Sequence, residues 1–278
     1  MKEFSFKVNE KFNNYKVIDF LKAQGVSREI ILKVKFGGIK LNQTIVSTAN
    51  QTVKTGDLVD IVLPPDKTNE YITPIKEDLK IIYEDQYLLA VFKPTGVLTH
   101  SSKHNKIKSL EQMVLGYIDE PVCFRPVNRL DRDTCGIVLI AKDAFTASLL
   151  SEQIKKGEVK KTYEALVVGV PKKERFFIEK PIKRLNENSM KRVCADGGQY
   201  ALTECKLLST ENNLSTLEII LHTGRTHQIR VHLASENLPL YADALYGEKV
   251  EGQTFTLIAK KLELVHPFTK EQLVLSVK

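Results

Sequence analysis

The segment from residue 124 to residue 142 constrains the fold more than any other part of the chain. Four consecutive apolar residues, 137–140, follow a turn that is crowded with charged side chains. Such a run predicts a buried strand, and the turn places Asp131 and its flanking arginines at the end of a sheet, where a rigid scaffold can direct them at a ligand. Charged residues before a strand more often form a solvent-exposed turn without a binding role. This pattern alone therefore leaves both interpretations open, a ligand site and a solvated turn.

The remaining patterns after residue 77 mix helices and strands without regular alternation. Ser109 and Gln112 form a capping box that predicts the start of a helix. Strands are expected at 81–83, 87–92, 162–168, 201–208 and 214–222, and helices at 144–154 and 226–234. This order predicts an α+β domain built on a mixed, largely antiparallel sheet.

A domain boundary is expected at the paired prolines, Pro64 and Pro65, which precede a polar stretch. We therefore divide the chain into a small α+β domain at 1–66, a linker at 67–76 and a larger domain at 77–278. In the small domain, Ser27 is placed to cap the second of two short helices. A Gly-Gly turn then leads into a strand at 39–41, and a Gly-Asp turn leads into another at 58–63.

The charge of the chain fits a polyanionic partner. The formal net charge is +7 and the isoelectric point is near 9.0, and each lysine or arginine that neutralises a phosphate releases condensed counterions. The first seven residues lack the apolar core of a signal peptide, and no later segment has the apolar length that crosses a bilayer. We expect a cytoplasmic, monomeric protein without a membrane partner.

Four motifs in the larger domain resemble those of the RluA/RluD-type pseudouridine synthases. Residues 129–136, RLDRDTCG, are similar to the catalytic motif of that family. Residues 160–165, KKTYEA, resemble its tyrosine motif, and residues 221–232, LHTGRTHQIRVH, closely match its arginine motif. Residues 82–100 resemble its first motif. Four motifs in the right order make coincidence improbable, and the resemblance covers residues 77–278.

The resemblance implies an active site of three residues. Asp131 is the catalytic carboxylate, Arg230 pairs with it, and Tyr163 stacks on the target base or takes part in proton transfer. By their residue types alone, Arg230 is equally a surface arginine on a helix and Tyr163 a core tyrosine. The family uses neither a metal nor another cofactor, and the sequence contains no histidine or cysteine spacing that suggests a metal site.

The resemblance also implies residues that bind RNA. Arg129 matches the residue that fills the space left by the everted base, and the alternative is a salt bridge to Asp131 or Asp133. Arg225 and His227, within the arginine motif, are further RNA-binding candidates.

The first domain resembles the S-four-type RNA-binding domain, with Arg28 and Lys40 as its candidate contacts. Together with other basic residues these would bind phosphates without reading sequence: Lys22, Arg28, Lys33, Lys35 and Lys40. A small capping domain without RNA contacts is the alternative.

Three positions depart from the family pattern. Asn128 stands where histidine is usual, Cys135 where serine is usual, and Phe92 where asparagine is frequent. Asparagine hydrogen-bonds but does not titrate near neutrality, so activity survives only if the histidine is structural. We expect an RNA pseudouridine synthase that acts on ribosomal RNA, most plausibly of the large subunit, with transfer RNA as the second candidate. A non-catalytic RNA-binding or ribosome-assembly protein is the alternative of a different class.

Overall fold

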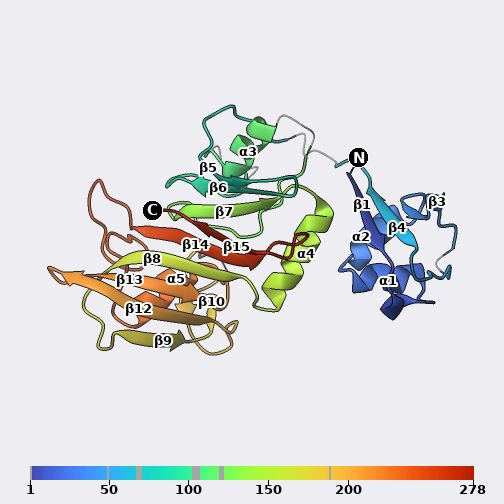
Figure 1. Ribbon diagram of the computed structural model, residues 1–278. Coiled ribbons are helices and arrows are strands. Elements are labelled where there is room, and N and C mark those ends of the chain that lie inside the picture. The colour runs from blue at the N-terminus through green and yellow to red at the C-terminus, as the bar shows by residue number, and fades with distance from the viewer. Residues whose placement is uncertain (1, 49, 67–70, 102–106, 119–121, 188) are drawn as a thin grey trace.

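The computed structural model describes residues 2–48, 50–66, 71–101, 107–118, 122–187 and 189–278. Two sheets organise these residues, one of four strands near the N-terminus and one of nine strands in the rest of the chain (Figure 1). Residues 67–70, which begin the expected linker, lie outside the described residues. Within the described ranges, no helix combines the length and the apolar character that crossing a bilayer requires.

The N-terminal sheet is antiparallel and packs against two short α-helices, which a single 3-10 turn precedes. Its order is β1-β4-β2-β3. The strands are β1 (Lys2–Lys7), β2 (Ile39–Leu41), β3 (Thr44–Ile45) and β4 (Leu58–Leu63). The helices are η1 (Glu10–Phe12), α1 (Val17–Ala23) and α2 (Arg28–Val34). The predicted cap of α2 is confirmed, because the Ser27 hydroxyl accepts the N–H of Ile30 at 3.3 Å. Strand β1 was not anticipated.

The large sheet is mixed and mostly antiparallel, which confirms the predicted fold class. Its order is β5-β6-β7-β14-β8-β13-β12-β9, with β15 paired to β14, and the β7–β14 pair is parallel. The strands are β5 (Ile81–Glu84), β6 (Leu88–Lys93), β7 (Cys135–Ala141), β8 (Lys160–Val168), β9 (Arg175–Glu179), β12 (Leu202–Glu211), β13 (Leu214–Leu221), β14 (Leu257–Val265) and β15 (Gln272–Ser276). A separate hairpin pairs β10 (Ile182–Arg184) with β11 (Arg192–Cys194).

Helices cover both faces of this sheet. Two of them, α3 (Leu110–Ile118) and α5 (Gln228–Ser235), contribute to the core on one face, and α4 (Ala144–Lys155) contributes to the core on the other. Strand β7 supplies Val138 to the first core and Leu139 to the second. Burial on both faces therefore explains why its apolar run is uninterrupted rather than alternating.

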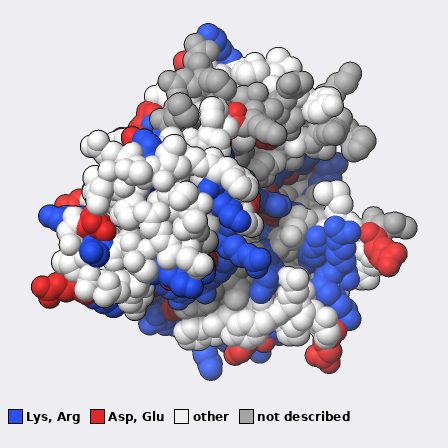
Figure 2. Space-filling view, turned by 90° about the vertical axis from the view of Figure 1, so that its right-hand side faces the viewer, with Lys and Arg blue, Asp and Glu red and all other residues white. Residues whose placement is uncertain are grey.

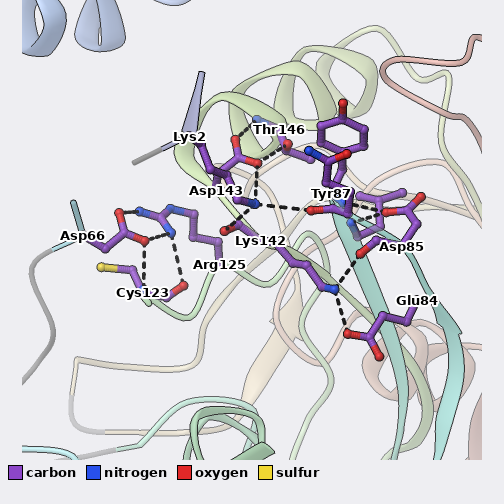
Figure 3. Close-up of polar contacts among 12 residues, drawn as sticks. Lys2, Asp66, Glu84, Asp85, Tyr87, Cys123, Arg125, Lys142, Asp143 and Thr146 are labelled. Carbon is purple, nitrogen blue, oxygen red and sulfur yellow. Dashed lines mark hydrogen bonds and ion pairs between the residues drawn. The ribbon is translucent and has the colours of Figure 1, made fainter. Parts of the chain in front are cut away.

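The N-terminal sheet contacts the larger domain through an aromatic cluster. The ring of Phe4 on β1 lies 5.0 Å from that of Phe145 on α4 and 5.5 Å from that of Phe268. Two ion pairs also join the two parts of the chain (Figure 3). Lys2 Nζ lies 3.3 Å from an Asp143 carboxylate oxygen, and Arg125 makes a bidentate contact with Asp66. The two parts of the chain thus share one apolar core region.

Candidate active site

The loop that contains Asp131 leads into the N-terminal end of the apolar strand β7. Lys93 hydrogen-bonds to the backbone of this loop. The ammonium group of Lys93 is fully buried and donates to the backbone carbonyls of Pro94, Val97 and Arg132 at 2.9, 2.7 and 2.8 Å. Burial lowers the pKa of Lys93 to about 8. These hydrogen bonds tie the backbone immediately after Asp131, at Arg132, to the turn at 94–97.

Arg230 on α5 is oriented by Asp243. Its Nε and Nη2 atoms each donate to a carboxylate oxygen of Asp243 at 2.7 Å, and both side chains are buried. The remaining nitrogen, Nη1, lies 3.6 Å from Asp131 Oδ2. Burial opposes the charge on Arg230, but the hydrogen bonds and charge of Asp243 outweigh it and raise its pKa. The guanidinium also lies over the rings of Phe255 and Tyr246, at 4.5 and 5.1 Å from their centres.

His227 lies at the N-cap of α5 with a left-handed φ of 57°, which is uncommon for a residue other than glycine. Its Nδ1 atom is 2.9 Å from the hydroxyl of Tyr246, and its Nε2 atom is 3.8 Å from Asp131 Oδ2. The Tyr246 oxygen already accepts the N–H of Arg192 at 2.7 Å. When Tyr246 donates its own proton to Nδ1, a neutral His227 carries its proton on Nε2, facing Asp131. Burial lowers the pKa of His227, so the neutral form dominates at neutral pH.

Tyr163 on β8 is buried beside this group. Burial raises the pKa of its phenol, and the negative charge of Asp131 raises it further. The phenol therefore stays protonated at neutral pH. No described residue hydrogen-bonds its hydroxyl, whereas an ordinary buried tyrosine usually finds a partner.

Asp131 itself is partly exposed and loosely held. Its side chain is 31% exposed, and the guanidinium of Arg230 at 3.6 Å and the imidazole of His227 at 3.8 Å, its closest basic neighbours among the described residues, lie beyond hydrogen-bond distance. The neighbouring carboxylates are engaged elsewhere, because Asp133 pairs with Arg132 and Asp243 pairs with Arg230. Asp131 is thus the carboxylate of this group that is open to a ligand.

Of the predicted RNA-binding residues, His227 lies largely buried beside Asp131, and the other four fall into two groups. Arg129 and Arg225 are exposed near the Asp131 loop and the start of α5, and Arg129 pairs with neither Asp131 nor Asp133. Arg28 and Lys40 belong to the N-terminal sheet and its helices, and Lys40 lies 3.0 Å from Glu3. Figure 2 shows lysines and arginines gathered across the middle of one face, with acidic residues mainly toward its edges.

Pairing divides the basic residues of the N-terminal domain. Lys22 pairs with Asp19 and Lys33 with Glu29, as Lys40 does with Glu3. Arg28 and Lys35 pair with no carboxylate in the described ranges.

The departure at Asn128 has a structural explanation. The Asn128 amide donates to the carbonyl of Ile137 and accepts the N–H of Leu139, both at 2.9 Å. The side chain therefore acts as an extra strand partner for β7 and does not face Asp131. A titrating side chain is not needed for that role.

Residues that the sequence did not single out complete the group. Asp243 and Tyr246 contact the predicted site residues Arg230 and His227, and Lys93 holds the backbone carbonyl of the residue after Asp131. The only local sign of Asp243 is a turn in which its carboxylate also accepts the N–H of Leu245 at 3.0 Å. An aspartate that caps a turn is too common a pattern to reveal its partner on α5.

Comparisons with known proteins agree on one family. A sequence profile described as RNA pseudouridylate synthase matches residues 87–235. The chain is 35% identical over 276 residues to the RNA pseudouridine synthase YhcT of Bacillus subtilis, covering 96% of this chain and 90% of that protein. It is 31% identical to the ribosomal large subunit pseudouridine synthase D of Xanthomonas campestris, covering 79% and 71%. The solved structure of human RNA pseudouridylate synthase domain containing 1 superposes with a TM-score of 0.61 at 25% identity, covering 73% of this chain and 84% of that one.

Proposed function

This chain belongs to the RNA pseudouridylate synthase family, and from that membership we propose that Asp131 is the carboxylate that isomerises uridine in structured RNA. One observation carries the assignment. Asp131 is partly exposed and accepts no side-chain hydrogen bond from the residues that the structure describes, while the fixed guanidinium of Arg230 lies 3.6 Å from it. A nearby positive charge compensates and orients a carboxylate when bound RNA excludes water from it.

The reaction moves the base from one linkage to another without loss of atoms. The bond between uracil N1 and the ribose anomeric carbon breaks, a bond from uracil C5 to that carbon forms, C5 loses its proton and N1 gains one. Asp131 either attacks the anomeric carbon or removes a proton from the neighbouring ribose carbon, and both routes need an ionised carboxylate. The geometry is compatible with either route.

Hydrolysis is the less suitable chemistry for this arrangement. Glycosidases protonate a leaving group and activate water or a nucleophile with two carboxyl groups. Here Asp133 and Asp243 are held by arginines, so neither is available as a partner for Asp131. A single available carboxylate suits retention of the base.

Tyr163 is proposed to contact the everted base. Its raised pKa keeps the phenol protonated at neutral pH, which favours stacking on the base over removal of the C5 proton. Arg129, exposed and unpaired among the described carboxylates, is proposed to fill the position that the everted uridine leaves. Extruding a base costs roughly a few kcal/mol, which such a contact offsets in part.

The RNA is proposed to be ribosomal RNA of the large subunit, with transfer RNA as the second candidate. The name of the Xanthomonas relative supports the first candidate. The N-terminal domain is proposed to be an S-four-type RNA-binding domain, because Arg28 and Lys35 remain available for phosphates. Mapping pseudouridines in ribosomal and transfer RNA from cells that lack the protein separates the two substrates.

Tritium release tests the role of Asp131. RNA labelled with tritium at uracil C5 is expected to lose its label to wild-type protein, whereas Asp131→Asn binds the RNA with similar affinity and releases none. Asp133→Asn is the matched control, since it removes the same charge two residues away and is expected to keep most of the activity. Equal release by Asp131→Asn and wild type would exclude the assignment. Absence of release by wild type from every RNA tested would favour the non-catalytic alternative.

A further inference from the structure

Two adjacent lysines on β8 differ sharply in their surroundings. Lys160 is exposed, and its Nζ atom lies 3.9 Å from Glu263 Oε2. Lys161 is half-buried, and no described residue makes an ion pair or a hydrogen bond with its ammonium group. Successive side chains on a strand point to opposite faces, which places Lys161 on the same face as Tyr163.

The surroundings of Lys161 confirm that orientation. Its cross-strand partner is Leu221 on β13, which packs against the core that contains Tyr163. A β-carbon built on Gly224 would lie 3.6 Å from Lys161 Nζ. The ammonium group therefore lies against the loop that leads from β13 to His227 and Arg230. Along β8 it is two residues from Tyr163, a separation of about 7 Å.

An unpaired, half-buried ammonium is costly to the folded protein. Burial lowers the pKa of Lys161, and among the described residues no carboxylate forms an ion pair with its ammonium group that would offset that effect. Buried lysines are normally paired. Of the other lysines before and on this strand, Lys155 pairs with Glu152 and Lys160 with Glu263, and Lys156 is exposed to solvent. Lys161 thus lacks an internal counter-ion where Lys155 and Lys160 have one.

We propose that Lys161 binds a backbone phosphate of the RNA beside the everted nucleotide. This rests on the proposed function, because it assumes that the target nucleoside lies between Asp131 and Tyr163. An RNA strand carries one negative charge per nucleotide, and a phosphate lies on each side of every ribose. A phosphate supplies the missing charge and accepts up to three N–H donors of a lysine, whereas a neutral uracil carbonyl supplies only an acceptor.

Lys161→Met and Lys160→Met form a matched pair, since each removes one positive charge from the same strand. A charge-assisted hydrogen bond corresponds to roughly a 10- to 100-fold change in affinity, and we expect Lys161→Met to lower RNA affinity and kcat/KM by that factor. Lys160→Met is expected to stay within about two-fold of wild type. Lys161→Arg, which keeps the charge, is expected to restore part of the affinity.

The salt dependence of RNA binding identifies the contact as a phosphate. Loss of one phosphate contact is expected to reduce the slope of log K against log salt by about 0.7 to 0.9 in Lys161→Met and to leave it unchanged in Lys160→Met. Substrates with single methylphosphonate linkages, which lack the charge, locate the phosphate. The linkage that weakens wild-type binding without weakening Lys161→Met further is the one Lys161 contacts.

Thermal stability separates binding from structure. Removing a half-buried unpaired charge is expected to leave the melting temperature of Lys161→Met equal to that of wild type or higher. Equal affinities and slopes for the two methionine variants would overturn the proposal, and so would a destabilised Lys161→Met with an unchanged salt slope. Failure of wild type to release tritium would instead remove the proposed function, while the binding measurements would still report on Lys161.

Discussion

Arg230 presents to Asp131 the one terminal nitrogen that Asp243 does not use. Asp243 takes Nε and Nη2 at 2.7 Å, and Nη1 lies 3.6 Å from Asp131 Oδ2. The orientation of the guanidinium is therefore set on its buried side, before any ligand binds. The positive charge of Arg230 compensates the negative charge of Asp131 without a hydrogen bond between them. The oxygens of Asp131 therefore stay accessible to a substrate.

Asp243→Asn tests that orientation. Breaking a buried ion pair by removing one partner is expected to lower the free energy of unfolding by roughly 3 kcal/mol. Displacement of Arg230 by about 1 Å is expected to reduce kcat roughly 100-fold with little change in KM. Urea unfolding and tritium-release kinetics measure the two effects. In Asp133→Asn, which breaks an exposed pair, the stability loss is expected to be about 1 kcal/mol or less. An unchanged kcat in Asp243→Asn would show that Arg230 needs no such support.

Tyr246→Phe tests the tautomer of His227. Loss of one neutral hydrogen bond is expected to lower kcat/KM roughly 3- to 10-fold. Nitrogen NMR of the imidazole should show the proton on Nε2 in wild type and a mixture of tautomers in the variant. Tyr117→Phe, which removes a hydroxyl bonded to Glu84 on the surface, serves as the control. A single unchanged tautomer in Tyr246→Phe would contradict the assignment.

Lys93→Met tests the support beneath the Asp131 loop through its pH dependence. The pKa of Lys93 in the folded protein is lowered to about 8, below its value in the unfolded chain, so the unfolded state binds more protons above that pH. The contribution of Lys93 to stability therefore rises between about pH 8 and about pH 10.4. Between pH 7.5 and 9.5, the stability difference between wild type and Lys93→Met should grow by about 1 to 2 kcal/mol in favour of wild type. A difference that stays constant with pH would refute the lowered pKa.

Phe4→Ala tests the contact between the two parts of the chain. Phe4 is buried against Phe145 and Phe268, and its truncation is expected to lower the free energy of unfolding by about 3 to 5 kcal/mol. Phe36→Ala is the matched control, since that ring is 91% exposed and its loss should change stability little. Urea unfolding measures both. Similar effects from the two variants would mean that the aromatic cluster does not join the domains.

Arg28→Gln combined with Lys35→Gln tests RNA binding by the N-terminal domain. These two cations are unpaired among the described residues, and their loss is expected to reduce the salt slope of RNA binding by about 1.4 to 1.8. Lys33→Gln removes a lysine that already pairs with Glu29, so its effect should be smaller. Point variants are preferable to deletion of residues 1–66, which would uncover Phe145 and Phe268. An unchanged slope in the double variant would favour a capping domain.

Features fixed by local chemistry were predictable from sequence. The Ser109 and Gln112 capping box forms as expected, with reciprocal hydrogen bonds of 3.1 and 3.3 Å. The apolar run before Ala141 forms β7, because a strand buried on both faces has no polar positions.

Features fixed by distant contacts were not predictable. Strand β1 was not predicted although Phe4 and Phe6 alternate with polar residues, because the run is short and part of its burial, as that of Phe4 against Phe145, comes from the larger domain. Asp243 was missed because its partner on α5 is known only after folding. A salt bridge from Arg129 to Asp131 or Asp133 was considered. Asp133 instead pairs with Arg132, which donates two hydrogen bonds to its carboxylate. Neighbouring arginines of the same motif are not distinguished by sequence alone.

The aromatic cluster around Phe4 has a consequence for substrate choice. Strand β1 packs on α4, and Lys2 on β1 forms an ion pair with Asp143 at the start of α4. These contacts fix the distance between the basic groups of the N-terminal domain and Asp131. We expect RNAs to be accepted when a phosphate-rich region and the reactive uridine occur at that same spacing. Discrimination between uridines would then come from the dimensions of the folded RNA rather than from its base sequence.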